Sequence, residues 1–180
     1  LPTVNFSRDG HVLVVRIKEA TLESLWQQGS ARYWLSSDGV LIREVTPDEW
    51  TSLREPPALL GPTMDGSILP PPAKAHLFIS LERSAPLVGA QRMDAAALQG
   101  AQTFLMALRA LFPDADTIEY DRAWSGWMQV RFQNTSLILF DPLHDPLAQF
   151  ERVKGLMRQQ VLPEHFEYVD VRFEDHIYYR

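Results

Sequence analysis

The densest group of side chains able to bind a cation or carry a proton is Asp141, His144 and Asp145, in the segment DPLHD. Two carboxylates around an imidazole could coordinate a metal ion or hold the histidine ready for proton transfer. Each carboxylate also has an ordinary structural role, because Asp141 follows a predicted strand and Asp145 precedes a predicted helix that starts with Pro146. We therefore expect turn and cap residues here, with His144 in a solvated loop and no metal site.

Two further groups contain residue types that are used in catalysis or ligand binding. Glu174, Asp175 and His176 lie in a predicted terminal strand, where nothing would exclude water from a reaction. Trp124 and Trp127 could stack on a sugar or a base. They flank a Ser-Gly pair, where a bulge or turn would leave one of them buried and the other exposed. We favour packing in the core, because tryptophan contributes a large buried area.

The chain has none of the short motifs that mark common enzyme classes: no GxSxG, no P-loop, no glycine-rich dinucleotide fingerprint and no HExxH. It has no cysteine, which excludes disulfides, thiolate metal sites and cysteine nucleophiles. A net charge of −6 without a Lys/Arg cluster argues against nucleic-acid binding. The sequence therefore predicts a protein that is not an enzyme, with no catalytic residues, no cofactor and no metal.

The chain is 180 residues long and 46% hydrophobic, which suits one large domain or one domain plus a fragment of another. No apolar run approaches the roughly 18 residues of a membrane-spanning helix. The first residues, LPTVNF, enter a strand without a preceding helix or cap. We expect this sequence to be part of a longer chain, with a membrane anchor as one candidate for the upstream part.

The first quarter of the chain is predicted to be mostly strand. HVLVVRIK at 11–18 is a β-branched run typical of a buried strand. A short helical turn is expected around Leu22–Trp26. ARYWLSSDGVLIRE at 31–44 predicts a hairpin, because Ser-Asp-Gly supplies the turn.

TPDEW at 46–50 predicts a helix start, with Thr46 as cap, Pro47 in the first turn and Glu49 completing a capping box. A proline-rich segment around 56–72 follows. It could be a polyproline ligand for another protein, although we favour the interpretation that it is a rigid loop.

From residue 75 onward, strands alternate with two helices that have an apolar stripe at helical spacing. The predicted elements are strand 75–81, helix 94–112, strands 116–122, 126–132 and 136–140, helix 146–160 and strand 166–174. Gln133-Asn134 is a plausible turn between two of these strands. This order predicts an α+β fold with a mostly antiparallel sheet and both helices on one face.

The last part of the chain resembles the bacterial cell-division family FtsQ/DivIB. In that family a strand pair, a loop and a helix precede a last strand that reads roughly Y-[VI]-D-[LV]-R-[YF], and residues 168–173 here read YVDVRF. The front of the chain resembles the final strands of the POTRA domain that precedes the family's β domain. The resemblance lies in LPTV, VLVVRIKE, a tryptophan and the SDG hairpin. The resemblance implies a partial POTRA domain at 1–45, with strand 11–18 paired to the 32–43 hairpin, and an FtsQ-type β domain at 46–180.

The same resemblance implies a single-pass protein of the cell inner membrane, with this region on the periplasmic side. Its function would be that of a non-catalytic divisome scaffold that recruits partners of the FtsB/FtsL type and, through them, the septal peptidoglycan synthase. The alternative is another extracytoplasmic POTRA-type module that serves outer-membrane protein assembly or secretion.

In the resembling family the last strand is an exposed edge to which FtsB adds a strand, so we expect residues 171–179 to form such an edge. Arg172 lies on the polar face and is expected to pair with an acidic partner, whereas Phe173 could face the core or the partner. A proline at Ile177 is expected to lower binding more than stability. The predicted partner-binding residues are Val171, Arg172, Phe173, Glu174, Asp175, Ile177, Tyr178 and Tyr179.

Overall fold

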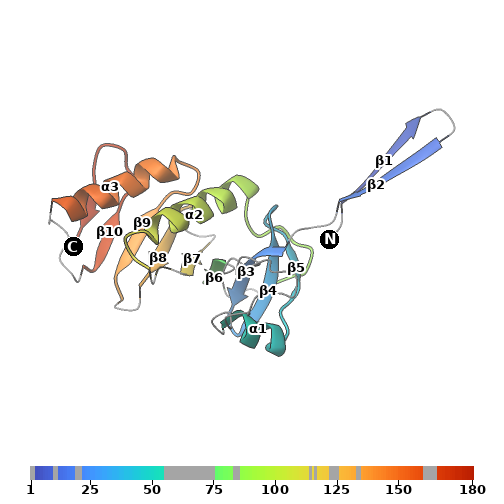
Figure 1. The fold of residues 1–180 in the computed structure, drawn as a ribbon, viewed down its shortest axis with the longest axis horizontal. Coiled ribbons are helices and arrows are strands. Elements are labelled where there is room, and N and C mark those ends of the chain that lie inside the picture. Colours follow the sequence, from blue (N-terminus) through green and yellow to red (C-terminus); the bar gives the residue numbers. More distant parts are fainter. Residues whose placement is uncertain are drawn as a thin grey trace, which may run out of the picture.

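A computed structural model describes residues 3–9, 12–18, 22–54, 76–82, 86–113, 115, 117–121, 126–132, 135–159 and 166–180 of the chain. The fold is α+β, as predicted, and is shown in Figure 1. In chain order the elements are β1 (Thr3–Asp9), β2 (Val12–Lys18), β3 (Leu22–Gln28), β4 (Ala31–Ser36), β5 (Leu41–Glu44), α1 (Pro47–Arg54), β6 (His76–Ser80), α2 (Ala95–Leu108), β7 (Thr117–Tyr120), β8 (Met128–Arg131), β9 (Leu137–Phe140), α3 (Pro146–Arg158), β10 (Tyr168–Asp170) and β11 (Tyr178–Tyr179).

The main layer is a nine-stranded mixed sheet with the strand order β11-β10-β9-β8-β7-β6-β3-β4-β5. The pairs β3–β6, β6–β7 and β9–β10 are parallel, and the remaining neighbours in this order are antiparallel. Helices α2 and α3 lie side by side over one face (Figure 1). The predicted arrangement of a mostly antiparallel sheet with two helices on one face is confirmed.

One row of side chains crosses most of the sheet on the face below these helices. From β3 to β11 its members are Trp26, Phe78, Ile118, Val130, Ile138, Val169 and Tyr179. All of them except Tyr179 are completely buried. Above the row, Phe104 of α2 stacks on Phe140 with ring centroids 4.3 Å apart, so helix and sheet share one core.

The predicted starts of the helices are confirmed. The Asp94 carboxylate accepts a hydrogen bond from the Ala96 amide at 2.8 Å, which caps α2. The Asp145 carboxylate accepts from two amides at the start of α3, and Pro146 occupies the first turn. These bonds satisfy amide groups that have no partner within a helix.

The predicted hairpin and capping box are also present. β4 and β5 pair antiparallel, and Gly39 in the turn between them has φ 76°, a value that suits glycine. At α1, the Thr46 amide donates to Glu49 Oε2 at 2.9 Å and the Glu49 amide donates to Thr46 Oγ1 at 3.3 Å. This reciprocal pair is the capping box.

Two predictions for the front of the chain are wrong. Leu22–Trp26 is not a helical turn but part of β3, because pairing with both β4 and β6 and complete burial of Trp26 outweigh local helix preference. The strand at 11–18 does not pair with the 32–43 hairpin. β2 pairs with β1 instead, with Asp9 opposite Val12, in a separate two-stranded sheet. Gly10 and His11, which separate the two strands in the sequence, lie outside the described residues. Asp-Gly is a strong signal for such a local hairpin.

The predicted division at residue 45 into two domains stays a prediction, although β3, from the first part, pairs with β6, from the second, in one sheet. The proline-rich segment 56–72, the Gln133-Asn134 turn and Trp124 lie outside the described residues. Within the ranges that the structure covers, no helix has the length and apolar character needed to cross a membrane.

Candidate functional site

The sheet ends at β11, and among the described residues β10 is the strand that pairs with it. Beyond the strand, the Arg180 amide donates to the Tyr168 carbonyl at 3.1 Å and the Arg180 carbonyl accepts from the Tyr168 amide at 3.4 Å. In an antiparallel pair, hydrogen-bonded and non-hydrogen-bonded positions alternate. Since Tyr168 and Arg180 form a hydrogen-bonded position, Val169 and Tyr179 form the next, non-hydrogen-bonded one. The Tyr179 amide and carbonyl therefore point away from β10, toward the open edge.

The chain leaves the sheet between β10 and β11, so the predicted continuous edge over 171–179 is wrong. The Val171 amide still donates to the Leu139 carbonyl at 3.0 Å, and its side chain is completely buried. Residues 173–175 then bend, and Ile177 packs against the core before β11 begins. Only Tyr178 and Tyr179 form strand in this stretch.

The predicted partner-binding residues thus fall into three environments. Val171 belongs to the core, and its side chain cannot contact a partner. Arg172 and Ile177 are half-buried. The exposed residues are Phe173, Glu174, Asp175, Tyr178 and Tyr179. Phe173 points outward, because the chain has left the strand before it and its side chain does not follow Val169 and Val171 into the core.

Phe173 and Tyr178 form an aromatic pair on the surface. Their ring centroids are 5.6 Å apart and their planes are nearly perpendicular at 85°, an arrangement that aromatic rings favour. This contact ties the start of the turn to β11. Tyr178 and Tyr179 point to opposite faces of the sheet because neighbouring residues alternate along a strand.

Arg172 is half-buried and held by contacts within the protein. Its Nε lies 2.8 Å from Asp170 Oδ1 and its Nη2 lies 2.6 Å from Asp170 Oδ2, while its own amide donates to Oδ1 at 3.2 Å. The guanidinium carbon sits 4.6 Å from the centroid of the Trp127 ring. The hydrogen bonds that the guanidinium donates to Asp170 raise the pKa of Arg172, so the group is a permanent cation with a dedicated counter-charge.

A hollow of about 480 Å³ opens beside this arginine. Its lining residues are Trp127, Asp141, His144, Arg172, Phe173, Glu174, Asp175 and His176. It therefore joins the two groups that the sequence placed far apart, around His144 and around His176. His144 Nδ1 lies 2.8 Å from Asp141 Oδ2. In the described part of the chain, however, no group of three or more His, Asp or Glu side chains is arranged to hold a metal ion.

The opposite end of the sheet is covered. The Leu41 amide of β5 donates to the Ala90 carbonyl at 3.2 Å, and the Gly89 amide donates to the Leu41 carbonyl at 2.8 Å. Arg43 of the same strand forms an ion pair with Glu49 of α1 at 2.5 Å. Covering loops and charged side chains are common means of keeping an edge strand from pairing with other chains.

Sequence comparisons assign no family to the chain. Neither the scan against protein-family models nor the search of curated proteins finds a match. The functional inference therefore depends on the geometry of the open edge and on the residue pattern at 168–173.

Proposed function

We propose that the protein is a non-catalytic scaffold of bacterial cell division, of the FtsQ/DivIB type, and that it binds an FtsB- or FtsL-type partner by adding a partner strand to β11. The observation that carries this proposal is the environment of Tyr179. Tyr179 ends a row of completely buried side chains, yet 48% of its own surface is exposed, at an edge where its backbone groups face outward.

The backbone at Tyr179 supplies the first half of the interaction. An outward amide and carbonyl can each form a hydrogen bond with an added strand, which is how edge strands bind extended peptides. The same groups are a liability if they stay open, because they can pair with any strand. The contrast with β5, which a loop and α1 protect, supports a functional reason for the open edge at β11.

The side chains supply the second half. A partner residue opposite Tyr179 would lengthen the buried row by one position and cover part of the tyrosine ring. On the other face, Tyr178 and Phe173 form an exposed aromatic surface. Since side chains of a strand alternate between faces, one partner strand would contact both surfaces with successive residues.

The pattern YVDVRF favours a cell-division partner over other strand donors, because it occupies β10 and the start of the turn next to the open edge. By this proposal the region lies on the periplasmic side of the inner membrane, anchored by an upstream helix. The bound partner would link it to the septal peptidoglycan synthase.

The test is Tyr179→Pro, measured by calorimetric titration with the extracytoplasmic segment of the FtsB-type protein from the same organism. Proline removes the outward amide but no hydrogen bond within the protein, and edge strands tolerate it. We expect about tenfold weaker binding, in line with one lost hydrogen bond and a clash at the edge. The melting temperature should stay within about 2 °C of the parent.

Tyr179→Ala is the matched control, because it removes the ring and keeps the amide. It should weaken binding less than the proline variant. The predicted test at Ile177 is less suitable, because Ile177 packs against the core and a change there affects folding as well as binding. Unchanged affinity of Tyr179→Pro at unchanged stability would show that the partner does not use this edge.

A further inference from the structure

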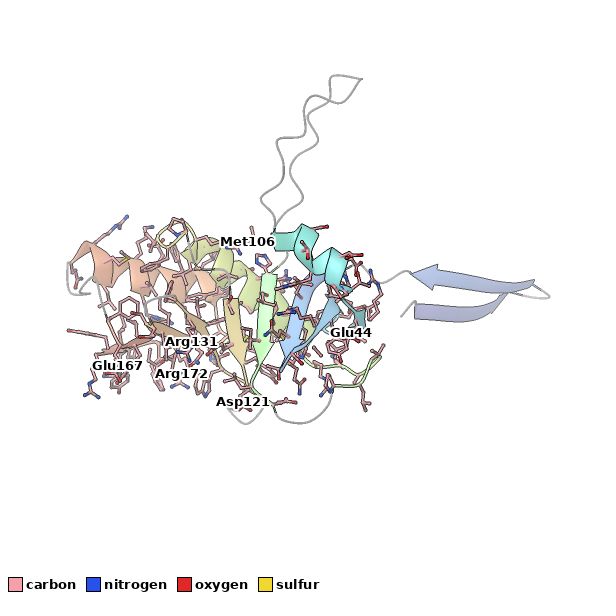
Figure 2. The ribbon with its side chains drawn as sticks, turned by 90° about the horizontal axis from the view of Figure 1, so that it is seen from below. Glu44, Met106, Asp121, Arg131, Glu167 and Arg172 are labelled. Carbon is pink, nitrogen blue, oxygen red and sulfur yellow. The ribbon has the colours of Figure 1, made fainter. Side chains whose placement is uncertain are left out.

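We propose that Arg172 is a positioning residue for the open edge: together with Asp170 and Trp127 it fixes the point where the chain leaves β10, and it does not offer its charge to a partner. The inference deepens the proposed function at the same site and rests on it for the binding measurement only. Figure 2 shows Arg172 on the side of the sheet away from α2 and α3.

The contact between Arg172 and Asp170 has the geometry of a permanent ion pair. Two guanidinium nitrogens face the two carboxylate oxygens at 2.8 and 2.6 Å, the fork-to-fork arrangement that gives the strongest pairs. The side chains are only 24% and 8% exposed, respectively. Leaving a carboxylate as buried as Asp170 without its counter-charge costs free energy. An acidic partner residue would therefore compete poorly with Asp170 for Arg172.

Trp127 holds the same arginine from a second element. The guanidinium lies over its ring at 4.6 Å, a cation–π contact, and Trp127 directly precedes β8. Arg172 thus connects β10, the start of β8 and the turn that follows β10. Because it comes directly after Val171, this connection fixes the direction in which the chain leaves the core.

The fixed turn matters because β11 is a short strand, whose other supports are the hydrogen bonds between Tyr168 and Arg180 and the packing of Ile177 against the core. The strand pairs with β10 at only two positions, Val169–Tyr179 and Asp170–Tyr178. Contact between the rings of Phe173 and Tyr178 links the start of the turn to β11. If residue 172 moves, the entropy of the turn rises and the short strand loses its place beside β10. An edge that is already ordered binds an added strand with a smaller entropic cost.

The charges that remain open on the turn also argue against an acidic partner residue at this position. Glu174 and Asp175 are exposed, and Arg172 is already neutralised by Asp170. We therefore expect a change of Arg172 to Glu to weaken binding from inside the protein, because the new carboxylate and Asp170 would repel each other.

A double-mutant cycle in the 180-residue chain tests the proposal, with Arg172→Gln, Asp170→Asn and the double variant. One readout is amide hydrogen exchange of Arg180 in the free protein, followed by NMR. The other is affinity for the FtsB-type segment. We expect each single variant to speed exchange at Arg180 and to weaken binding about five- to tenfold. The double variant should bind no more weakly than the weaker-binding single variant, because both changes break the same connection.

Two further variants serve as comparison. Arg131→Gln breaks a similar arginine–carboxylate pair, with Glu119 at 2.7 Å on the same face of the sheet, and should leave exchange at Arg180 unchanged. Trp127→Leu removes the ring and keeps the ion pair, and should change both readouts in the same direction by a smaller factor. It also keeps the test decisive if Asp170→Asn lowers global stability.

The opposite result for Asp170→Asn overturns the proposal. If Arg172 contacts an acidic partner residue, Asp170→Asn frees the arginine and will leave the affinity unchanged or raise it, whereas Arg172→Gln will lower the affinity. Unchanged exchange at Arg180 in both single variants overturns it as well. Failure of the proposed function gives a different pattern, because Tyr179→Pro then binds normally while the exchange measurement still reports on Arg172.

Discussion

Glu49 shows how much one exposed carboxylate can depend on its neighbours. The guanidinium of Arg43 and the amide of Thr46 donate hydrogen bonds to it, with Arg43 the larger influence, and together they lower the pKa of Glu49 from 4.5 to about 2. The ionised form is therefore the form that the folded protein stabilises.

The pH dependence of α1 follows from this shift. Because the pKa of Glu49 is lower in the folded than in the unfolded chain, its contribution to stability is present above about pH 4.5 and is lost as the pH falls toward 2. We expect Glu49→Gln to flatten the pH dependence of urea unfolding between about pH 4.5 and 2. Asp48→Asn, outside the capping box, is the control and should keep the parent's slope. An equal loss of slope in both variants would contradict the prediction.

Some residues of the site could be placed from the sequence and others could not. The caps at Asp94, Asp145 and Thr46 were predictable because their hydrogen bonds reach no further than three residues along the chain. The ion pair of Arg172 with Asp170 could also have been predicted, since residues two apart share a face of a strand. The contact with Trp127 was not, because it depends on β9 lying between β8 and β10.

At the scale of elements, α2 approaches the loop before α3 so closely that only glycine fits. A Cβ atom added to Gly100 would overlap the backbone carbonyl of Pro142. Glycine normally destabilises a helix interior by about 1 kcal/mol relative to alanine, so its presence here reflects packing.

Two glycine variants separate packing from helix propensity. Gly100→Ala should lower the free energy of unfolding by about 1–3 kcal/mol, because backbone must move to admit the methyl group. Gly155→Ala in α3 has nothing within 4 Å of the added atom and should raise stability by about 0.5–1 kcal/mol. Urea denaturation of both variants gives the comparison, and a stabilised Gly100→Ala would refute the close approach.

Helices, the meander β7–β8–β9 and the β4–β5 hairpin were predictable as elements, because their signals are local. Strand order was not. β3 lies between β4 and β6 only because tertiary burial of Trp26 overrides a locally helical segment, and the parallel pairings join strands that no turn connects. The tail was predicted as one strand because its alternation continues past Asp170. A turn in this position carries no glycine or proline signal.

At the scale of the whole molecule, order should fall from the centre of the sheet toward β11. The central strands are paired on both sides and lie under α2 and α3, whereas β11 has one neighbour and two paired residues. We expect amides of Ile118 and Val130 to exchange most slowly, Arg180 far faster, and Tyr179 at nearly the rate of an unstructured chain. If the FtsB-type segment binds as proposed, amide exchange measured by NMR should slow more at Tyr179 than at any residue of β5.

The parallel pairings of the sheet bear on how this chain folds. β7, β8 and β9 follow one another with short connections, and they can pair as soon as they are collapsed. β3 must wait for β6, from which it is separated by β4, β5, α1 and the proline-rich segment, and β10 must wait for α3 to cross back to β9. Closing such long loops is slow compared with forming local hairpins. The transition state for folding would therefore centre on the meander and α2, and β11, which can pair only once β10 is in place, would be the last strand to join the sheet.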